Sequence, residues 1–430
     1  MRFLRDARWL LIATTLLAAA MLAVACEEEE EEAAETPEAT TAAASPEATT
    51  SAAAEEVPGV TDTEILLGTH LPLSGSPAAA YAPIGDGMRS YFEYINDVEG
   101  GVHGRKIKLL IGDDHYNPPD TMEVVRKLVE QDEVFAIISG LGEETHKAVW
   151  KYLEEKGVPD MFISSGLKQW AEPVVRTRFG YLPEYHLEGR MLGMYIAENY
   201  DGKKLGLLLQ NDDFGKEGEE GLRMGLEGSD VEIAAIEKYE AMQFDVTAQT
   251  QRLKNAGVDV IAVYAIPPSA ASLVKTARET LNWDVPIIVS SVVQSDIFIQ
   301  IAGVENAEGI ISVVFGHQIY ETDIPGVQLH IANMEKYIPG VPASNFSLYG
   351  SSIAELMVEA LKRAGPDLTR DSLIEGAESI RGWMSSLGFE GIPISLSPED
   401  HRPVEAEIYN RVEDGEWIPF GEPISFETTQ

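Results

Sequence analysis

From Glu64 onward the chain repeats one pattern: a short apolar run rich in Ile, Leu and Val, then a turn, then an amphipathic segment. Such runs are typical of strands buried on both faces, and the amphipathic segments are typical of helices that cover a sheet. The predicted strands are 65–71, 107–111, 134–138, 161–164, 205–209, 231–236, 260–264, 287–289 and 310–314, with last strands around 405–410 and 417. The predicted helices include 85–96, 119–131, 145–156, 185–199, 215–226, 244–255 and 269–281. Strands alternating with helices over this length predict an α/β fold whose parallel sheets are flanked by helices, and the count predicts two sheets.

The N-terminal segment does not follow this pattern. Three arginines within the first eight residues precede an apolar stretch, 10–25, which is too short to span a bilayer comfortably. This arrangement predicts a signal peptide over residues 1–25. Cys26, the only cysteine of the chain, follows at once, and a cysteine in this place is typical of bacterial lipoproteins, in which it is acylated. The sequence therefore predicts lipid attachment at Cys26, and an ordinary cleaved signal peptide is the alternative.

The segment that follows Cys26, up to residue 56, consists of Glu, Ala, Thr, Pro and Ser and includes eleven glutamates and no aromatic residue. Such a composition cannot bury enough apolar surface to fold. We therefore predict a disordered acidic tether over residues 26–56. Attached to a lipid, it would hold the folded part away from the membrane as a self-repelling spacer.

The folded part is strongly acidic. The formal net charge of the chain is −39, of which the leader accounts for +2 and the tether for −11, so residues 57–430 carry −30. Nucleic acids and anionic lipid surfaces need a basic footprint, and both are therefore excluded as expected partners. With a single cysteine, the fold cannot depend on an internal disulfide.

Ligands of open α/β sheets bind beyond the carboxyl ends of the strands, so the loops that follow the predicted strands are where a site is expected. Those loops are 72–77, 140–145, 164–170, 210–215, 265–268 and 290–294. In or beside them, the predicted ligand-binding residues are Ser74, Glu143, Glu144, Thr145, Ser165, Lys168, Trp170, Tyr185, Phe214, Tyr264, Ile266 and Ser291.

Several strings of the sequence carry a family resemblance. LPLSG, INDVEGGVHGRKIKLLIGDD, VEQDEVFAIISGLG and QNDDFGKEG follow one another in an order and spacing that resemble the type I periplasmic binding proteins. More narrowly, they resemble the branched-chain amino-acid-binding branch, whose members deliver ligands to ABC importers. LKNAGVDVIAV and SPEDHRPV extend the match over nearly all of the predicted fold. NDDFG together with SPEDHRPV is also similar to a subgroup that includes binders of aromatic carboxylates.

The resemblance implies two Rossmann-like lobes, joined by three crossover segments, that close on a small molecule by a hinge movement. We expect the crossovers near Phe179, Val313 and Pro403. The first lobe would then comprise residues 57–181 and 315–402, and the second residues 182–314 and 403–430.

At two positions the chain departs from the amino-acid binders. In those binders, serine and threonine groups after the third strand hold the ligand carboxylate. In this chain Thr145 alone keeps that chemistry, at a helix N-terminus. Glu143 or Glu144 facing the cleft would repel a carboxylate. Near Ser291 those binders carry an acid that pairs with the ligand ammonium, and serine cannot supply that charge. The ligand therefore need not be an α-amino acid.

Aromatic side chains offer another way to hold a ligand. Trp170, Tyr181, Tyr185, Phe214 and Tyr264 lie in or just beyond the predicted cleft loops, and stacking on their rings suits a planar or apolar ligand. The alternative is that Tyr181 and Tyr264 are core residues at strand ends.

The charged candidates near the cleft also have two interpretations. Lys168 would supply a cation for a carboxylate, and Glu143 or Glu144 would accept hydrogen bonds from hydroxyls or amines. The alternative for the two glutamates is that they occupy a first helical turn, where the helix dipole favours acids.

The sequence shows no motif for catalysis. HExxH, Gly-x-Ser-x-Gly and the phosphate-binding Gly-x-x-x-x-Gly-Lys loop are all missing, and Asp113-Asp114-His115 is interpreted as part of a turn. We expect neither a catalytic activity nor a metal or other cofactor.

The expected protein is an exported, lipid-anchored receptor of the cell envelope, on the outer side of the cytoplasmic membrane. It would hand a branched-chain amino acid or an aromatic carboxylate to the permease subunits of an ABC transporter. Two alternatives stay open: a sensory lipoprotein that signals to a membrane partner, and a hydrolase on the same scaffold.

Overall fold

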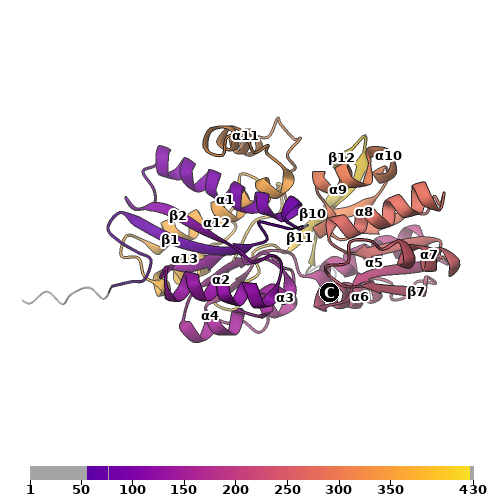
Figure 1. Cartoon of the computed structure of the whole chain (residues 1–430), viewed down its shortest axis with the longest axis horizontal. Helices are drawn as coiled ribbons and strands as arrows, with labels where there is room; N and C mark the ends of the chain where they lie inside the picture. Colours follow the sequence, from indigo (N-terminus) through magenta and orange to yellow (C-terminus); the bar gives the residue numbers. More distant parts are fainter. Residues whose placement is uncertain (1–55, 76, 427–430) are drawn as a thin grey trace, which may run out of the picture. The chain divides into compact units, whose positions relative to one another are not determined.

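The structure, a computed structural model, describes residues 56–75 and 77–426. The predicted signal peptide, Cys26 and the predicted tether as far as Glu55 lie outside the described residues. Residues 56–75 and 77–426 contain two β-sheets, which we call the first and the second sheet (Figure 1).

The first sheet has five strands within the described chain, in the order β2-β1-β3-β4-β5, and all of them are parallel. Its strands are β1 (Glu64–Leu71), β2 (Lys106–Asp113), β3 (Ala136–Ile138), β4 (Asp160–Ile163) and β5 (Arg178–Gly180). The short β3 and β4 are buried along their whole length, which is why they are continuous apolar runs in the sequence.

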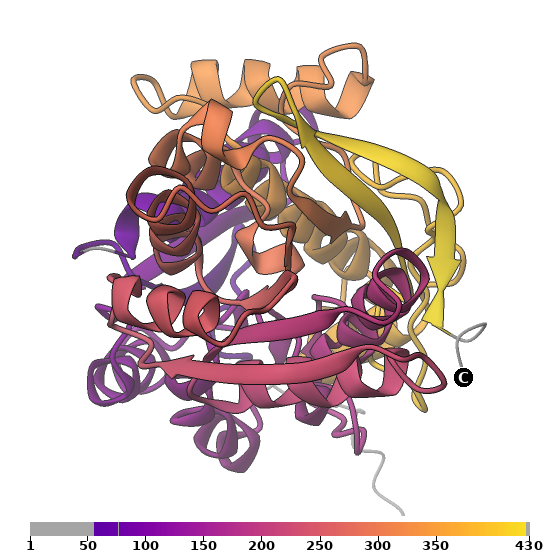
Figure 2. The ribbon, with the colours of Figure 1, turned by 90° about the vertical axis from the view of Figure 1, so that its right-hand side faces the viewer.

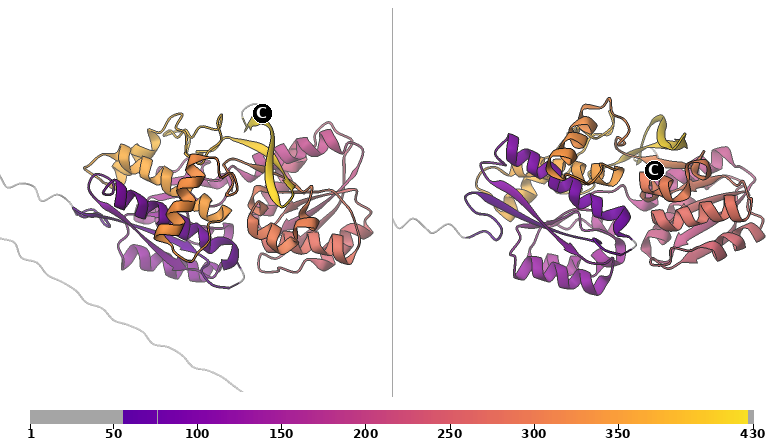
Figure 3. Two further views of the ribbon diagram at one scale, coloured as in Figure 1. Left: turned by 90° about the horizontal axis from the view of Figure 1, so that it is seen from above. Right: turned by 45° about the horizontal axis from the view of Figure 1, so that its top comes forward.

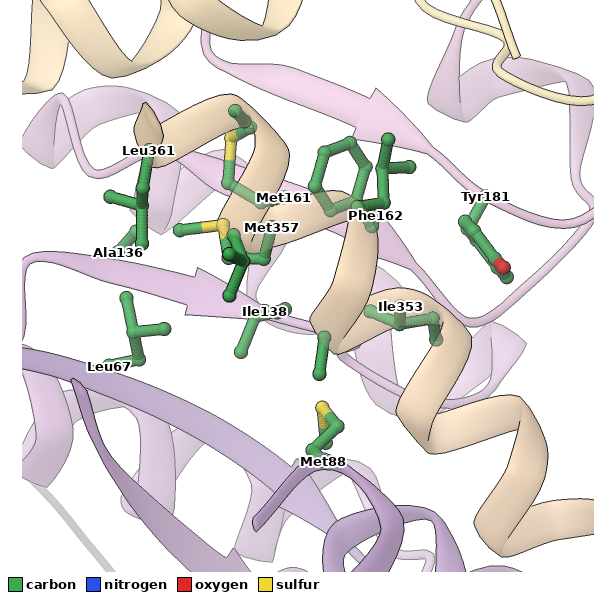
Figure 4. Packing of buried hydrophobic residues seen from close by; sticks show 14 of the residues in the cluster. Leu67, Met88, Ala136, Ile138, Met161, Phe162, Tyr181, Ile353, Met357 and Leu361 are labelled. Carbon is green, nitrogen blue, oxygen red and sulfur yellow. The ribbon is translucent and has the colours of Figure 1, made fainter. Parts of the chain in front are cut away.

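Helices from two distant parts of the chain cover the first sheet. They are α1 (Ala78–Val98), α2 (Pro118–Glu130), α3 (Glu143–Lys147), α4 (Trp150–Lys156), α11 (Pro325–Tyr337), α12 (Asn345–Ala364) and α13 (Arg370–Glu378). Figures 1 and 3 place α12 beside α1, and the two helices are in contact. Met357 and Leu361 of α12 are fully buried in one core with Leu67, Ala136 and Ile138 of the sheet (Figure 4).

The second sheet has seven strands within the described chain, in the order β12-β11-β10-β9-β8-β6-β7. Its strands are β6 (Lys204–Gln210), β7 (Glu232–Tyr239), β8 (Val260–Tyr264), β9 (Ile287–Val289), β10 (Ile311–Val314), β11 (Ala406–Glu413) and β12 (Glu416–Ser425). The strands β6 to β10 are parallel, whereas β11 and β12 form an antiparallel hairpin at one edge (Figure 2). The expectation of parallel sheets is thus correct except at this edge.

The helices that pack on the second sheet are α5 (Tyr185–Asn199), α6 (Asp213–Gly225), α7 (Thr247–Asn255), α8 (Pro267–Lys275), α9 (Asp296–Ala302) and α10 (Val304–Ala307). Helices α5 and α6 approach closely enough for their backbones to touch. A Cβ atom at Gly221 would lie 2.1 Å from the carbonyl oxygen of His186, and one at Gly193 would lie 2.5 Å from that of Leu222. Only glycine allows this approach.

The described chain passes between the two sheets three times: from β5 to α5, from β10 to α11, and from α13 to β11. We call each sheet with its helices a lobe. None of the helices in the described part of the chain is both apolar and long enough to cross a bilayer.

Most predicted elements are confirmed, and two helices differ. The predicted helix 145–156 is divided into α3 and α4, and the predicted helix 269–281 ends as α8 at Lys275 and continues as a π-helical turn, Thr276–Thr280. Strand β5 was missed, because its three residues Arg-Phe-Gly form no apolar run.

Candidate ligand-binding site

A pocket of about 960 Å³, including its open mouth, lies between residues of the two lobes. It is bordered by the loops that follow β3, β4, β6, β8, β9 and β10, as expected for the carboxyl ends of parallel strands. The first two turns of α1 and α12, together with Tyr116 after β2, Leu182 and Leu387, complete the lining. Most of the lining is apolar or aromatic, which is typical of sites that enclose small organic molecules.

Three rings from the first lobe form one wall of the pocket. The Tyr81 and Tyr116 rings are stacked with centroids 6.2 Å apart, and the Phe346 ring meets Tyr81 edge-on at 5.2 Å. Tyr81 lies in the first turn of α1 and Phe346 in the first turn of α12, so the contact between these helices brings the rings together.

A second group of rings comes from the other lobe. Phe214 is 1% exposed, and its ring centroid lies 4.6 Å from that of Tyr185 and 5.3 Å from that of Tyr264. Helix α6 begins with Asp212 as its N-cap, which accepts a hydrogen bond from the Gly215 N–H and so fixes the turn that carries Phe214. Phe214 and Tyr185 line the pocket, while Tyr264 lies behind them.

Glu143 is the acidic residue that lines the pocket. It stands in the first turn of α3, is 5% exposed, and accepts hydrogen bonds at Oε1 from Tyr185 Oη (2.8 Å) and Ser165 Oγ (3.2 Å). Trp170 Nε1 in turn donates to Ser165 Oγ at 2.8 Å. Burial, and then the nearby charge of Asp212, raise the pKa of Glu143 to about 7, although the two hydrogen bonds favour its charged form.

The pocket has little positive charge to balance this acid. Among the described residues, neither a lysine nor an arginine lines it. His317 is the one histidine of that lining, and its Nδ1 lies 3.1 Å from Glu321 Oε1.

Three amide side chains of the lining have unused hydrogen-bonding atoms. Gln294 Nε2, Gln318 Oε1 and Asn345 Nδ2 are buried and make no hydrogen bond within the described part of the chain. Asn345 is held in place from both sides, because its Oδ1 accepts from Ile319 N at 2.8 Å and its own N–H donates to Asp296 at 3.0 Å. These amides are available to neutral polar groups of a ligand.

A buried row of four side chains supports the Glu143 loop from behind. Asp114 Oδ2 lies 2.8 Å from His70 Nδ1, and His146 Nε2 lies 2.8 Å from Asp160 Oδ2. The two histidines are joined by a hydrogen bond between His70 Nε2 and His146 Nδ1. A Cβ at Gly140 would lie 2.4 Å from His146 Nδ1, so the loop reaches this row only with glycine there. We call Asp114, His70, His146 and Asp160 the Asp-His-His-Asp row.

Five of the twelve predicted ligand-binding residues line the pocket: Glu143, Tyr185, Phe214, Ile266 and Ser291. Ser165, Trp170 and Tyr264 are buried directly behind Glu143 and Phe214 and support them.

The other four predicted residues lie elsewhere. Ser74 is exposed and bonds with Asp113, and Thr145 donates to the carbonyl of Leu141. Glu144 pairs with Lys147 at 2.8 Å, and Lys168 pairs with Glu172 at 3.1 Å.

Sequence reasoning missed lining residues from helices and late segments, and Tyr116 from the loop after β2, which was not among the predicted cleft loops. The others are Tyr81, Phe346, Tyr349, Gln318 and Asn345. The loop rule that located the site looks only at the ends of strands. Tyr81 carried a usable signal, since it stands one helical turn after a predicted cleft loop.

The chain matches a known protein family along most of its length. The family model described as "Periplasmic binding protein" matches residues 64–416. An amino acid binding protein of Pseudomonas aeruginosa is 24% identical over 216 residues, which are 50% of this chain and 58% of that relative. The chain thus matches less than two thirds of that relative's length.

Solved structures share the fold. A branched-chain amino acid ABC transporter protein from Thermus thermophilus with bound valine has a TM-score of 0.76 and 20% identity, and the match covers 86% of this chain and 99% of that one. A solute binding protein from R. palustris in complex with benzoate has a TM-score of 0.72 with 19% identity, covering 84% of this chain and 98% of that one. Together with the family match, the two lobes and the pocket between them show that the chain belongs to the periplasmic binding protein family.

Proposed function

We propose that the chain is an extracytoplasmic solute-binding protein that captures a small organic molecule between its lobes and delivers it to the permease subunits of an ABC importer. Its membership of the periplasmic binding protein family supports an extracytoplasmic location. We further propose that lipid attachment at Cys26 keeps it at the cell surface, and that no catalytic step takes place.

The observation that carries this proposal is that both lobes contribute side chains to one apolar pocket. Glu143 and Tyr81 come from the first lobe, and Tyr185 and Phe214 come from the second. A ligand that touches both walls favours the closed arrangement of the lobes, and closure is what a membrane partner can recognise.

Direct contacts between the lobes support the same proposal. Lys147 Nζ of α3 pairs with Asp213 Oδ2 of α6 at 2.6 Å. Tyr185 of α5 donates to Glu143 of α3, and the backbone N–H of Lys168 donates to Glu217 of α6 at 3.1 Å. These contacts would break when the lobes separate, so they contribute to the stability of the closed state.

The relatives indicate the size of the ligand. Those compared above are described as binding an amino acid, valine or benzoate. A pocket with apolar walls from Ile84, Leu141 and Ile266 and a ring wall from Tyr81 and Phe346 accommodates an apolar body of that kind. We propose that the ligand is a small molecule with a branched aliphatic or aromatic body.

Thermal unfolding of the chain from Glu27 onward, in the presence of a ligand panel, tests the proposed function. The panel contains leucine, isoleucine, valine, benzoate and polyols, together with the amines and amides named below. A ligand that binds only the folded state raises the unfolding midpoint in proportion to the logarithm of its concentration. Binding of no member would contradict the proposal, and recovery of a chemically altered ligand would favour the hydrolase alternative.

A further inference from the structure

We infer that the ligand of this pocket carries a protonated amino group, or a similar organic cation, which lies against Glu143 among the rings of Tyr81, Tyr116 and Phe346. This inference rests on the proposed function, because it names the class of molecule that the same pocket takes. It also separates this chain from binders that hold a ligand carboxylate at the loop after the third strand.

The first reason is the free side of the Glu143 carboxylate. Both hydrogen bonds that other residues donate to it, from Tyr185 and from Ser165, end on Oε1. Oε2 receives none from another residue of the described chain, and Glu143 borders the pocket. The further donor to this carboxylate is the Glu143 backbone N–H. An ammonium group at Oε2 would supply both another donor and the opposite charge.

The second reason is the direction in which the hydroxyl groups around the pocket donate. Ser291 Oγ donates its proton to Glu188, and Tyr349 Oη donates its proton to Ser164 Oγ at 2.9 Å. Tyr185 Oη donates to Glu143. Because each hydroxyl has one proton, these three oxygens can only accept hydrogen bonds from a ligand. Glu188 adds a second fully buried carboxyl group directly behind Ser291.

The third reason is the ring wall. A cation within about 6 Å of an aromatic centroid is attracted by the negative face of the ring, and the attraction grows when water is excluded. Tyr81 is 5% exposed, and its ring neighbours Tyr116 and Phe346 line the same side of the pocket. Carboxylate and ring faces together form a recognition site for organic cations.

A ligand carboxylate would find no comparable partner. The described lining offers it no lysine or arginine, and the acids Glu143, Glu188 and Asp212 all repel it. The neutral donors Gln294 Nε2 and Asn345 Nδ2 suit a carbonyl or hydroxyl group elsewhere in the ligand.

Two series of probes test the sign of the charge with the wild-type chain. The first series consists of 3-phenylpropan-1-amine, 3-phenylpropanamide and 3-phenylpropanoate, and the second of 4-methylpentan-1-amine, 4-methylpentanamide and 4-methylpentanoate. Within each series the apolar body is constant and the head group is cationic, neutral or anionic. Isothermal titration at pH 8 should show the amine binding at least about tenfold more tightly than the carboxylate in one or both series.

A matched pair of variants tests whether Glu143 is the residue that binds the cationic group. Glu143→Gln should weaken binding of the amine by about tenfold or more and leave the amide within about threefold, because glutamine keeps the shape and removes the charge. Glu144→Gln, next to it but exposed and paired with Lys147, should leave both affinities unchanged. Circular dichroism of each variant checks that it is folded.

The outcomes distinguish this inference from the proposed function. Tighter binding of a carboxylate, or binding of leucine, valine or benzoate when both amines fail to bind, overturns the cation assignment and leaves the proposed function intact. An amine affinity that is unchanged in folded Glu143→Gln also overturns it. If no probe and no member of the wider panel binds, the proposed function fails together with the inference.

Discussion

His70 Nε2 and His146 Nδ1 lie 3.0 Å apart in the interior of the first lobe, where both side chains are fully buried. Their rings are nearly parallel, with an interplanar angle of 13°. Asp114 and Asp160 close the row at its two ends, each 2.8 Å from the outer ring nitrogen of the nearer histidine. All four side chains are buried, so each depends on its neighbour in the row for a hydrogen bond.

Removing one ring from this row should destabilise the fold strongly. In His146→Asn the Asp160 carboxyl group, which is 2% exposed, loses its imidazole hydrogen-bond partner, and we expect the free energy of unfolding to fall by about 3 kcal/mol. His115→Asn is the matched control, because the His115 side chain is 56% exposed. This substitution should lower the free energy of unfolding by less than about 1 kcal/mol. Urea unfolding of both variants gives these values. Equal losses in the two variants would contradict the role given to the row.

The fold should become more stable when the pH is lowered from 8 to about 5.5. Burial raises the pKa of Glu143, Glu184, Glu188 and Glu217 to about 7, so these groups stay protonated in the folded state after their unfolded counterparts have ionised. Each such group therefore raises the free energy of unfolding at low pH by about 3 kcal/mol relative to high pH. This contribution is lost as the pH rises from about 4.5 to about 7.

Two histidines act in the opposite direction in the same pH range. Burial lowers the pKa of His186 and His330 to about 4, so their contribution is lost as the pH falls below about 6.5. Because four carboxyl groups stabilise the fold on acidification and two histidines destabilise it, the free energy of unfolding should rise overall between pH 8 and pH 5.5. Urea unfolding at pH 8, 6.5 and 5.5 measures it, and Glu217→Gln should make the dependence shallower. Stability that falls between pH 8 and 5.5 would refute the prediction.

The Phe214 ring should contribute to affinity. Phe214→Leu keeps an apolar side chain but loses the ring contacts, and we expect the best ligand of the panel to bind about 0.5 to 1.5 kcal/mol more weakly. Phe298→Leu provides the control, because Phe298 is equally buried in the second lobe but does not line the pocket. Isothermal titration should show a change in affinity for the first variant only. If Phe214→Leu binds the ligand as tightly as Phe298→Leu does, the Phe214 ring does not contribute to the affinity.

The ion pair between Lys147 and Asp213 should favour lobe closure. Lys147→Ala removes a 2.6 Å contact between α3 and α6, and the ligand affinity should fall by up to about 1 kcal/mol, mostly through faster dissociation. Lys127→Ala removes a pair of the same length, with Asp132, that lies within the first lobe. Stopped-flow dissociation should therefore be faster in the first variant alone. A similar effect of both would mean that the charge acts at long range rather than as a contact between lobes.

Membrane association should depend on Cys26. In Cys26→Ser no acyl chain can be attached, so the protein should move from the membrane fraction to the soluble fraction. Fractionation with a blot for the chain measures this, and retention of the variant on membranes would remove the anchor from the proposed function.

The fold could be predicted from the sequence because buried parallel strands are short apolar runs. The bounds of β8 and β9 were predicted to the residue, and so were those of α5. Strand β5 was missed because it is three residues long and begins with a charged residue, Arg178, whose guanidinium donates to the carbonyl of Trp170.

Only part of the candidate site could be predicted. The rule for strand ends located the loops that carry Glu143, Phe214 and Ile266, but it does not say which way a side chain turns within a loop. Trp170 points inward, where it donates to Ser165. The rings of Tyr81 and Phe346 meet only because α1 and α12, about 260 residues apart, pack together, and a single sequence does not reveal such a contact.

The bare backbone contact between α5 and α6 leaves no layer of side chains to absorb a displacement. A shift of Tyr185 at the pocket end of α5 would therefore be transmitted to α6 as a movement of the whole helix pair. Met224, near the far end of α6, is 42% exposed, and the described residues contain no cysteine. A dye attached to Met224→Cys would then convert occupancy of the pocket into a change of fluorescence, which makes this protein a scaffold for an optical sensor of its own ligand.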